Sequence, residues 1–542
     1  MPEKIEKIII VGGGSAGWMT AAYLKRAFGK SIRISLVESS NISTIGVGEA
    51  TFSTIKLFFD YLGLDESEWM PQCNAAYKLA IKFVNWNAER RHFYHPFQRY
   101  EIVEGFNIAE WWLKLKEALT AYDYSCFTIP VMCDSKRSPR YLNGRIFDDK
   151  VEEHFKPERA FQKNVLLDLK IQYPYAYHFN ASLLANFLRD HAVQNGVEQI
   201  LDDVVDVKLA EDGSIAHITT REHGDIEGDL FIDCTGFRGL LINKALGEPF
   251  IPFSESLLCD SAVAMQVPRD IATDGINPYT TATALNAGWV WNIPLYGRDG
   301  TGYVYSSAFA SREEAEKEFR EHLGSVSDNL NALHIKMRIG RNRNSWVKNC
   351  VAIGLSSGFV EPLESTGIFF IQHGIEELVS DFPDKSFNEE VVKSYNKAIA
   401  DCIDGVRDFL ILHYYASTRY DTPFWKAAMH DLIIPEALKE RLKLWKARLP
   451  NNRNINQNYH GFESYSYSVM LLGLGYRPEH SLPVLDHIEG HQAWAAFRAI
   501  KKRADHLCRT LPSQYEYLTT MRNKTSQIAP QDMQYLVNRL EV

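Results

Sequence analysis

Residues 7–17 read KIIIVGGGSAG, a run of apolar residues that passes directly into spaced glycines. Four consecutive aliphatic residues after Lys7 are typical of a buried strand. Gly12, Gly14 and Gly17 then form a GxGxxG pattern, which permits a tight turn and lets backbone amides approach a pyrophosphate at a helix N-terminus. The stretch predicts a dinucleotide site, and the alternative interpretation is a glycine turn that binds nothing.

The residues that follow complete a β-α-β unit. A helix is expected over 18–28 and a second strand over 32–38, which ends at Glu38. An acidic side chain in that position can bind a ribose hydroxyl. A later apolar strand, 230–233, runs into Cys234-Thr235-Gly236, a second glycine turn that favours FAD over NAD.

The rest of the chain indicates a mixed α/β fold without internal repeats. Residues 184–233 alternate between helix and strand patterns, and from about residue 374 the chain becomes helix-rich and aromatic, with a polar loop at 451–458. We expect an α/β fold with a mixed nucleotide-binding region and a second, helix-rich subdomain.

Composition narrows the class of protein. The 542 residues are 45% hydrophobic, which suffices for a sizeable core, and the net charge of −9 gives no basic excess for nucleic acid. The N-terminus lacks a signal-peptide pattern, and no apolar run approaches the roughly 18 residues that a membrane span needs. We therefore expect a cytoplasmic protein that binds neither nucleic acid nor membrane.

The cysteines are scattered and form no CxxC pair or zinc-ligand cluster. We expect no metal site and reduced, mostly buried thiols at Cys73, Cys126, Cys133, Cys234, Cys259, Cys350, Cys402 and Cys508.

Three further motifs carry a family resemblance. Residues 289–294 read WVWNIP and match a WxWxIP motif, residues 358–368 read GFVEPLESTGI, and residues 77–86 contain YKLAI and FVNW. Over nearly its whole length the chain resembles the flavin-dependent tryptophan halogenases. The wording of residues 174–179, 278–283 and 459–463 is closest to the tryptophan 5-halogenase branch, which implies attack at C5 of the indole.

The resemblance implies a reaction and its partners. Family members receive FADH2 from a separate NAD(P)H-dependent flavin reductase, and O2 then gives a flavin C4a-hydroperoxide. Chloride or bromide attacks it to form hypohalous acid, which moves to a distant pocket that holds free L-tryptophan. The resemblance also implies a homodimer. It further implies a fold in which an FAD-binding GxGxxG box, Rossmann-like and of the flavin monooxygenase type, carries a mostly helical pyramid. The predicted limits are 1–85 and 150–375 for the box, and 86–149 and 376–542 for the helix-rich substrate-binding pyramid.

The resemblance assigns the catalytic roles to Lys78 and Glu364. An enclosed ammonium can hydrogen-bond hypohalous acid or, after losing its proton, form a haloamine, whereas an ordinary strand lysine points into solvent. The alternation of residues 77–83 places Lys78 and Lys82 on one strand face. A carboxylate beside the cationic ring intermediate can accept its proton, whereas Glu364 could instead merely favour a helix dipole. Thr366 and Gly367, at the same helix start, are the expected halide site.

Further residues are predicted to contact tryptophan or FAD. The resemblance implies that Trp289 and Trp291 keep the substrate away from the flavin, and the alternative is that they are packed core aromatics. Gln172 and Tyr175 are expected to border the substrate pocket. Predicted contacts to tryptophan are His95, Phe97, Tyr459, Glu463 and Tyr467. Predicted contacts to FAD are Gly12, Gly14, Ser15, Ala16, Gly17, Glu38, Ala50 in the loop 45–51, Val204, Leu355 and Ile368.

Three alternatives stay open at this point. The most serious is a halogenase for another aromatic substrate, such as indole, a phenol or peptide-bound tryptophan. An FAD-dependent aromatic hydroxylase and a non-catalytic FAD-binding protein are the others. Glu463 favours a ligand with an amino group.

Overall fold

A six-stranded sheet places the glycine-rich segment at the edge that a nucleotide would use. The structure is a computed structural model that describes residues 3–41, 48–154 and 173–527. The first five strands in the sheet order are parallel and the last is antiparallel. Their order is β10 (Glu198–Leu201), β2 (Arg33–Glu38), β1 (Lys7–Val11), β14 (Leu230–Asp233), β23 (Cys350–Ala352) and β22 (Trp346–Val347).

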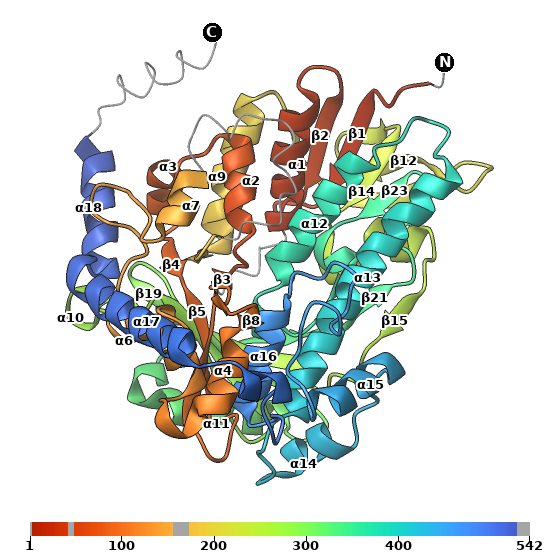
Figure 1. The fold of residues 1–542 in the computed structure, drawn as a ribbon. Coiled ribbons are helices and arrows are strands. Elements are labelled where there is room, and N and C mark those ends of the chain that lie inside the picture. Colours follow the sequence, from red (N-terminus) through yellow and green to blue (C-terminus); the bar gives the residue numbers. More distant parts are fainter. Residues whose placement is uncertain (1–2, 42–47, 155–172, 528–542) are drawn as a thin grey trace.

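Helices lie beside this sheet. The helix α1 (Ser15–Phe28) leaves the glycine turn three residues earlier than the sequence predicted and packs against α9 (Ala181–Gln194) and α12 (Gly367–Ser380). Figure 1 shows β1, β2 and α1 at one end of the molecule, with α12 next to them. The predicted β-α-β order and the mixed α/β class are confirmed.

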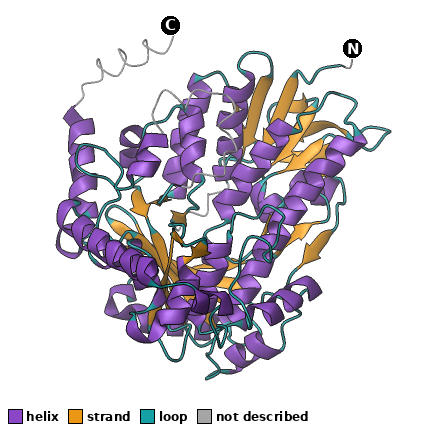
Figure 2. Cartoon of the chain, in the orientation of Figure 1, coloured by secondary structure: helices purple, strands orange, loops and turns teal. Residues whose placement is uncertain are grey.

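A second, mostly antiparallel sheet forms the centre of the molecule. Its order is β20 (Leu333–Lys336), β16 (Ser261–Pro268), β19 (Arg298–Tyr305), β18 (Gly288–Pro294), β17 (Tyr279–Ala284), β5 (Ala80–Val84) and β6 (His92–Pro96). Figure 2 shows its strands surrounded by helices and loops.

The single strand expected over 77–83 is wrong. The chain breaks at Leu79, so Lys78 ends β4 (Ala76–Lys78) and Lys82 lies on β5, in a different sheet. Lys78 is fully buried, whereas the Lys82 side chain is 19% exposed and lies near Asp134. The cause is tertiary pairing: β4 bonds to β9 (Ala176–Phe179), while Leu79 donates its amide to Pro278.

The remaining described strands form smaller sheets. The set comprises β3 (Glu49–Ala50) with β9 and β4; β11 (Val204–Leu209), β12 (Ile215–Thr220) and β13 (Gly224–Glu227); β15 (Phe250–Pro252), β21 (Gly340–Asn342) and β24 (Gly358–Phe359); and β7 (Ile102–Val103) with β8 (Phe106–Asn107).

After β24 the described chain contains helices and no strand, as the sequence predicted. The longest helix, α13 (Glu389–Tyr415), runs through this part, and residues 451–458 belong to no helix or strand. The others are α14 (Pro423–His430), α15 (Glu436–Trp445), α16 (Ser464–Leu474), α17 (His491–Thr510) and α18 (Gln514–Gln527). Earlier helices are α2 (Ile55–Leu62), α3 (Glu66–Gln72), α4 (Ile108–Leu115), α5 (Tyr122–Cys126), α6 (Ile129–Asp134), α7 (Asp149–His154), α10 (Ile271–Asp274) and α11 (Arg312–Leu323).

One large apolar core joins the sheets to the helices, from Ile5 to Met521. The hairpin β5–β6 also pairs residues on both sides of the limit expected at 85, and the division into box and pyramid stays a prediction. All eight cysteines are free thiols, and seven of them are buried.

The predictions about membrane spans, the loop 45–51 and Gln172 can be compared with the described residues. Among the described residues, no helix has both the length and the apolar character needed to cross a bilayer. Gln172 and residues 45–47 of the loop 45–51 lie outside the described residues.

The glycines of the turn give a matched test of the fold. A Cβ on Gly17 would lie 1.8 Å from the carbonyl oxygen of Gly12, whereas a Cβ on Gly14 would meet nothing within 4 Å. We expect Gly17→Ala to lower the free energy of unfolding by about 1–3 kcal/mol and Gly14→Ala to leave it nearly unchanged. Thermal unfolding of both variants without added FAD checks this, and equal losses would contradict the packing argument.

Candidate active site

The predicted nucleotide-binding residues meet at the carboxyl ends of the parallel strands. Gly12 has φ +111°, and a Cβ there would lie 2.4 Å from the carbonyl oxygen of Cys234, so the turns after β1 and β14 are in close contact. Within the part of the chain that the structure describes, no side chain caps α1 at Gly14. The first amides of α1, at Ser15 and Ala16, are therefore available for an anion such as a pyrophosphate.

Glu38 lies against the glycine turn. Its carboxylate accepts hydrogen bonds from Gln199 Nε2 at 2.6 Å and Trp18 Nε1 at 3.3 Å, and a Cβ on Gly13 would collide with it. This places an acidic side chain at the end of β2 beside the first turn of α1, where a ribose would follow a bound pyrophosphate. The open turn and this carboxylate fit the ADP part of FAD.

The four other predicted cofactor contacts lie on four different elements. Val204 begins β11, three residues beyond the pairing of Leu201 with Glu38. Leu355 follows Gly354, whose Cβ would touch Ala16. Ala50 ends β3 and Ile368 lies in the first turn of α12.

Lys78 is held inside the protein by two oxygen atoms. Its Nζ donates to the Thr51 carbonyl at 3.0 Å and to Ser365 Oγ at 2.8 Å, and lies 5.1 Å from the centre of the Phe97 ring. Burial lowers the pKa of Lys78 to about 7, although the charge of Glu364 opposes the change. The amine therefore titrates near neutral pH in an enclosed site.

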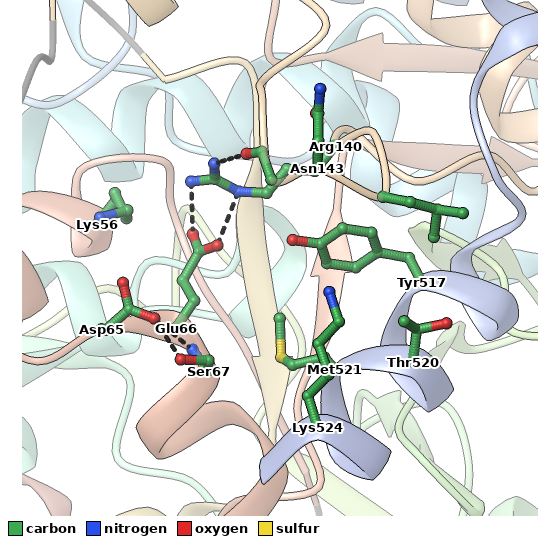
Figure 3. Close-up of a pocket in the computed structure, with 12 residues that line it drawn as sticks. Lys56, Asp65, Glu66, Ser67, Arg140, Asn143, Tyr517, Thr520, Met521 and Lys524 are labelled. Carbon is green, nitrogen blue, oxygen red and sulfur yellow. Dashed lines mark hydrogen bonds and ion pairs between the residues drawn. The ribbon is translucent and has the colours of Figure 1, made fainter.

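Tyr77, which precedes Lys78 on β4, is held by a hydrogen bond to a buried carboxylate. Tyr77 donates its hydroxyl to Glu66 at 2.7 Å, and the same carboxylate faces the Arg140 guanidinium. Burial opposes ionisation of Glu66, but Arg140 and the tyrosine hydroxyls outweigh it and hold its pKa at about 2. Figure 3 shows this ion pair in the wall of a cavity of about 340 Å³ between α3 and α18.

Glu364 is clamped by two histidines. His413 Nε2 lies 2.8 Å and His95 Nδ1 3.0 Å from its carboxylate oxygens, and all three side chains are buried. His413 is oriented in turn by donating Nδ1–H to the Phe409 carbonyl at 2.8 Å. Burial opposes ionisation, but the two histidines outweigh it, so the pKa of Glu364 falls to about 2. The group is a carboxylate throughout the physiological range.

The segment between these two groups turns sharply. Ser365 has φ +63°, a left-handed conformation that is uncommon outside glycine. It lets the Ser365 hydroxyl reach Lys78 while the preceding residue, Glu364, faces the histidines. Thr366 follows as the N-cap of α12, and its buried Oγ1 has no hydrogen-bond partner among the described residues. That position, with the Gly367 amide, suits an anion.

Aromatic rings enclose the Lys78–Glu364 region. Phe52 lies 6.0 Å from Phe97 and 5.4 Å from Phe462 between ring centres, and Phe462 stacks on Phe409 at 4.0 Å. His95, predicted to contact the indole, lies 6.5 Å from Phe462 and has a buried Nε2 without a partner in the described chain. The enclosure suits a flat apolar ring.

The other predicted substrate contacts differ in their surroundings. Glu463 accepts a bidentate ion pair from Arg99, with Nε at 2.9 Å. Tyr459 packs against Phe369 and His373. Tyr467 is buried, with its hydroxyl 2.7 Å from His460 Nε2.

The two tryptophans of the WVWNIP segment lie on one face of β18. Their ring centres are 6.4 Å apart, and Trp289 donates its Nε1–H to Glu361 at 3.1 Å. Glu361 is fully buried, and burial raises its pKa to about 7 despite hydrogen bonds from Tyr414 and Trp289. Among the described residues no histidine contacts Glu361, whereas two histidines contact Glu364.

Sequence reasoning missed His413, Thr51, Ser365 and Arg99. His413, a partner of Glu364, lies in the last turn of α13 and is 49 residues away in the sequence. Thr51 acts through its carbonyl, which no residue type reveals. Arg99 had a detectable signal, because it follows His95 and Phe97 at alternate positions.

Comparison with known proteins agrees with this arrangement. The family described as tryptophan halogenase matches residues 7–490. The tryptophan 6-halogenase SttH of Streptomyces toxytricini is 51% identical over 523 residues, covering 95% of this chain and 98% of SttH. The 7-chloro-L-tryptophan 6-halogenase KtzR of Kutzneria sp. (strain 744) is 52% identical, covering 95% and 99%.

Solved structures give the same fold. The crystal structure of SttH has a TM-score of 0.89 at 50% identity and covers 95% of this chain and all of that one. Tar14, a tryptophan C-6 flavin-dependent halogenase from taromycin biosynthesis, has a TM-score of 0.89 at 48% identity, with coverage of 95% and 100%.

These relatives correct one expectation. They are named as 6-halogenases, so the comparisons do not support the 5-halogenase branch or attack at C5. The hydroxylase and non-catalytic alternatives also fall, because the match spans most of the chain at high identity. The chain belongs to the tryptophan halogenase family and is a flavin-dependent tryptophan halogenase.

Proposed function

We propose that the protein halogenates C6 of the indole ring of free L-tryptophan. The observation that carries the chemistry is the burial of the Lys78 ammonium and the Glu364 carboxylate beside one cluster of aromatic rings, with the hydroxyl of the adjacent Ser365 bonded to Lys78. The position on the ring is carried by SttH, KtzR and Tar14, all named as acting at C6.

The cofactor belongs at the sheet edge described above. The residues that would hold FAD are the glycine turn, the start of α1 and Glu38, with Ala50, Val204, Leu355 and Ile368 along the remainder. When bound in its reduced form, with O2 and chloride or bromide, the flavin supplies hypohalous acid. A separate NAD(P)H-dependent flavin reductase provides FADH2, and the protein acts as a homodimer in the cytoplasm.

Lys78 delivers the halogen. Thr51 and Ser365 accept two of the three ammonium hydrogens among the described residues, which leaves one donor for the oxygen of hypohalous acid. As the ring carbon bonds to the halogen, the oxygen–halogen bond breaks, and the oxygen takes a proton from Lys78 and leaves as water.

Glu364 completes the substitution. Its carboxylate stabilises the cationic ring and then takes the proton from the carbon that bears the halogen. A pKa near 2 makes it a weak base, which suffices because a cationic ring carbon loses its proton readily. His95 and His413 hold the carboxylate in place. Thr366 and Gly367 would hold the halide.

The direct test is a product analysis. The protein is incubated with L-tryptophan, chloride, FAD, NADH and a flavin reductase, and the product is examined by mass spectrometry and proton NMR. We expect a monochlorinated tryptophan whose coupling pattern places the halogen at C6. A product halogenated at C5 or C7 would contradict the proposed attack at C6. If neither chloride nor bromide gives a halogenated product, the proposal that L-tryptophan is the substrate would be contradicted.

KtzR supports a second candidate substrate. Because that relative is named for 7-chloro-L-tryptophan, the same assay should include this compound. A higher kcat/KM for 7-chloro-L-tryptophan than for L-tryptophan would make it the preferred substrate.

Glu361 and Glu364 form a matched pair for testing the carboxylate. Both are buried, but only Glu364 touches the two histidines. We expect Glu364→Gln to lower product formation on the order of 10²- to 10⁴-fold while flavin oxidation continues. Glu361→Gln keeps an acceptor for Trp289 and should lose far less. Equal losses would contradict the role of Glu364.

The pKa of Lys78 predicts a pH dependence. Because the acid form donates the proton, the rate of halogen transfer should fall as pH rises through about 7. Glu364 stays ionised and adds no limb above about pH 3. Single-turnover product formation at saturating L-tryptophan measures this. A rate that rises with pH would instead favour the haloamine route.

A further inference from the structure

A single buried carboxylate accepts three tyrosine hydroxyls beside the strand that carries Lys78. Glu66 is the first residue of α3, and its side chain is buried. It accepts a hydrogen bond from each of three fully buried tyrosines: Tyr77 at 2.7 Å, Tyr175 at 2.8 Å and Tyr177 at 2.6 Å. Because the pKa of Glu66 is about 2, the carboxylate is ionised and can only accept, so all three hydroxyls donate to it.

The strand β4 is short, and its register depends on few bonds. It has three residues and pairs with β9 on one side, and on the other side the Tyr77 amide donates to Gln514 Oε1 at 3.2 Å. Tyr77 is paired with Tyr177, so these two rings share one face of the sheet while Lys78 lies on the other. A slip of one residue would exchange Tyr77 and Lys78. The bond from Tyr77 to Glu66 opposes this slip.

Tyr177 connects the same carboxylate to the oxygen that binds the lysine. The Tyr177 carbonyl accepts hydrogen bonds from the Thr51 amide at 3.0 Å and the Thr51 hydroxyl at 2.9 Å. The Tyr177 amide donates to that hydroxyl oxygen at 3.0 Å. The Thr51 carbonyl in turn accepts from Lys78 Nζ at 3.0 Å. One carboxylate therefore holds the residue before Lys78 and, through Tyr177, the residue that accepts from its amine.

We propose that Glu66 is a positioning residue for halogen transfer: it holds β4 and β9 so that the Lys78 amine keeps its place against the Thr51 carbonyl. The inference rests on the proposed function, because it takes Lys78 as the group that delivers the halogen. Burial and the charge of Glu364 act on the pKa of Lys78. Removing a tyrosine hydroxyl changes no formal charge, so a change in that pKa would report a displaced amine.

The first test removes one hydroxyl at a time, in Tyr77→Phe and Tyr177→Phe. The measurement is the yield of halogenated tryptophan per flavin oxidised in a single turnover. We expect this yield to fall on the order of 10- to 100-fold, because a displacement of about 1 Å can cost about 10²-fold in rate. Flavin oxidation itself should continue at the wild-type rate.

Tyr303→Phe is the matched control. Tyr303 is fully buried on β19 and donates its hydroxyl to Glu318 of α11 at 2.9 Å, so it shares with Tyr77 a strand position, burial and a helix carboxylate as partner. It should lose thermal stability as the other two variants do, but keep the wild-type yield.

The second test follows the titration of Lys78 by NMR in protein isotopically labelled at the lysine Cε, with Lys78→Met assigning the signal. In Tyr77→Phe and Tyr177→Phe we expect the pKa of Lys78 to rise from about 7 toward its ordinary value of 10.5, because a displaced amine is less completely removed from water. Glu364 and His178, the titratable groups that interact with Lys78, are unaltered in both variants.

A wild-type yield and a wild-type Lys78 titration in both variants would overturn the proposal, as would equal losses in Tyr303→Phe. Glu66→Gln should show the largest effect, because it also places an amide against the Arg140 guanidinium. Should that variant fail to fold, the two tyrosine variants decide. The titration needs no turnover, so a wild-type protein that does not halogenate L-tryptophan would refute the proposed function, whereas an unaltered titration in the tyrosine variants would refute this inference.

Discussion

The burial of an ammonium and a carboxylate beside one cluster of aromatic rings is the constraint on which the rest of the structure depends. An isolated charge in an apolar interior is strongly unfavourable, so each buried ion needs its own donors or acceptors. Lys78 obtains a backbone carbonyl from Thr51 and a hydroxyl from Ser365, and Glu364 obtains two histidines. Segments distant in sequence must therefore converge on a small volume.

The convergence explains several local features. The break at Leu79 turns Lys78 away from the large sheet and into the pocket. The left-handed Ser365 directs its hydroxyl to Lys78 just before α12 begins. A Cβ on Gly354 would meet both Ala16 of α1 and Ile371 of α12, so α12 passes beside the cofactor edge shortly after the reacting groups.

Two buried carboxyls on the same short segment show how partners decide chemistry. Glu361 and Glu364 are both inaccessible to solvent, yet the pKa of Glu361 rises to about 7 while that of Glu364 falls to about 2. Burial raises both. Glu361 receives hydrogen bonds from neutral groups, whereas imidazoles that can carry charge face Glu364. The difference separates a carboxyl that holds Trp289 from one that can stabilise a cation.

The sequence by itself determined the elements that depend on local pattern. The apolar run before Gly12 and the spacing of the glycines predicted β1, the turn and α1, because strand burial and glycine backbone freedom are properties of neighbouring residues. The motifs at 289–294 and 358–368 likewise indicated the family. Tertiary structure alone decided the strand break at Leu79 and the partners His413 and Arg99, because these depend on contacts between residues tens to hundreds of positions apart.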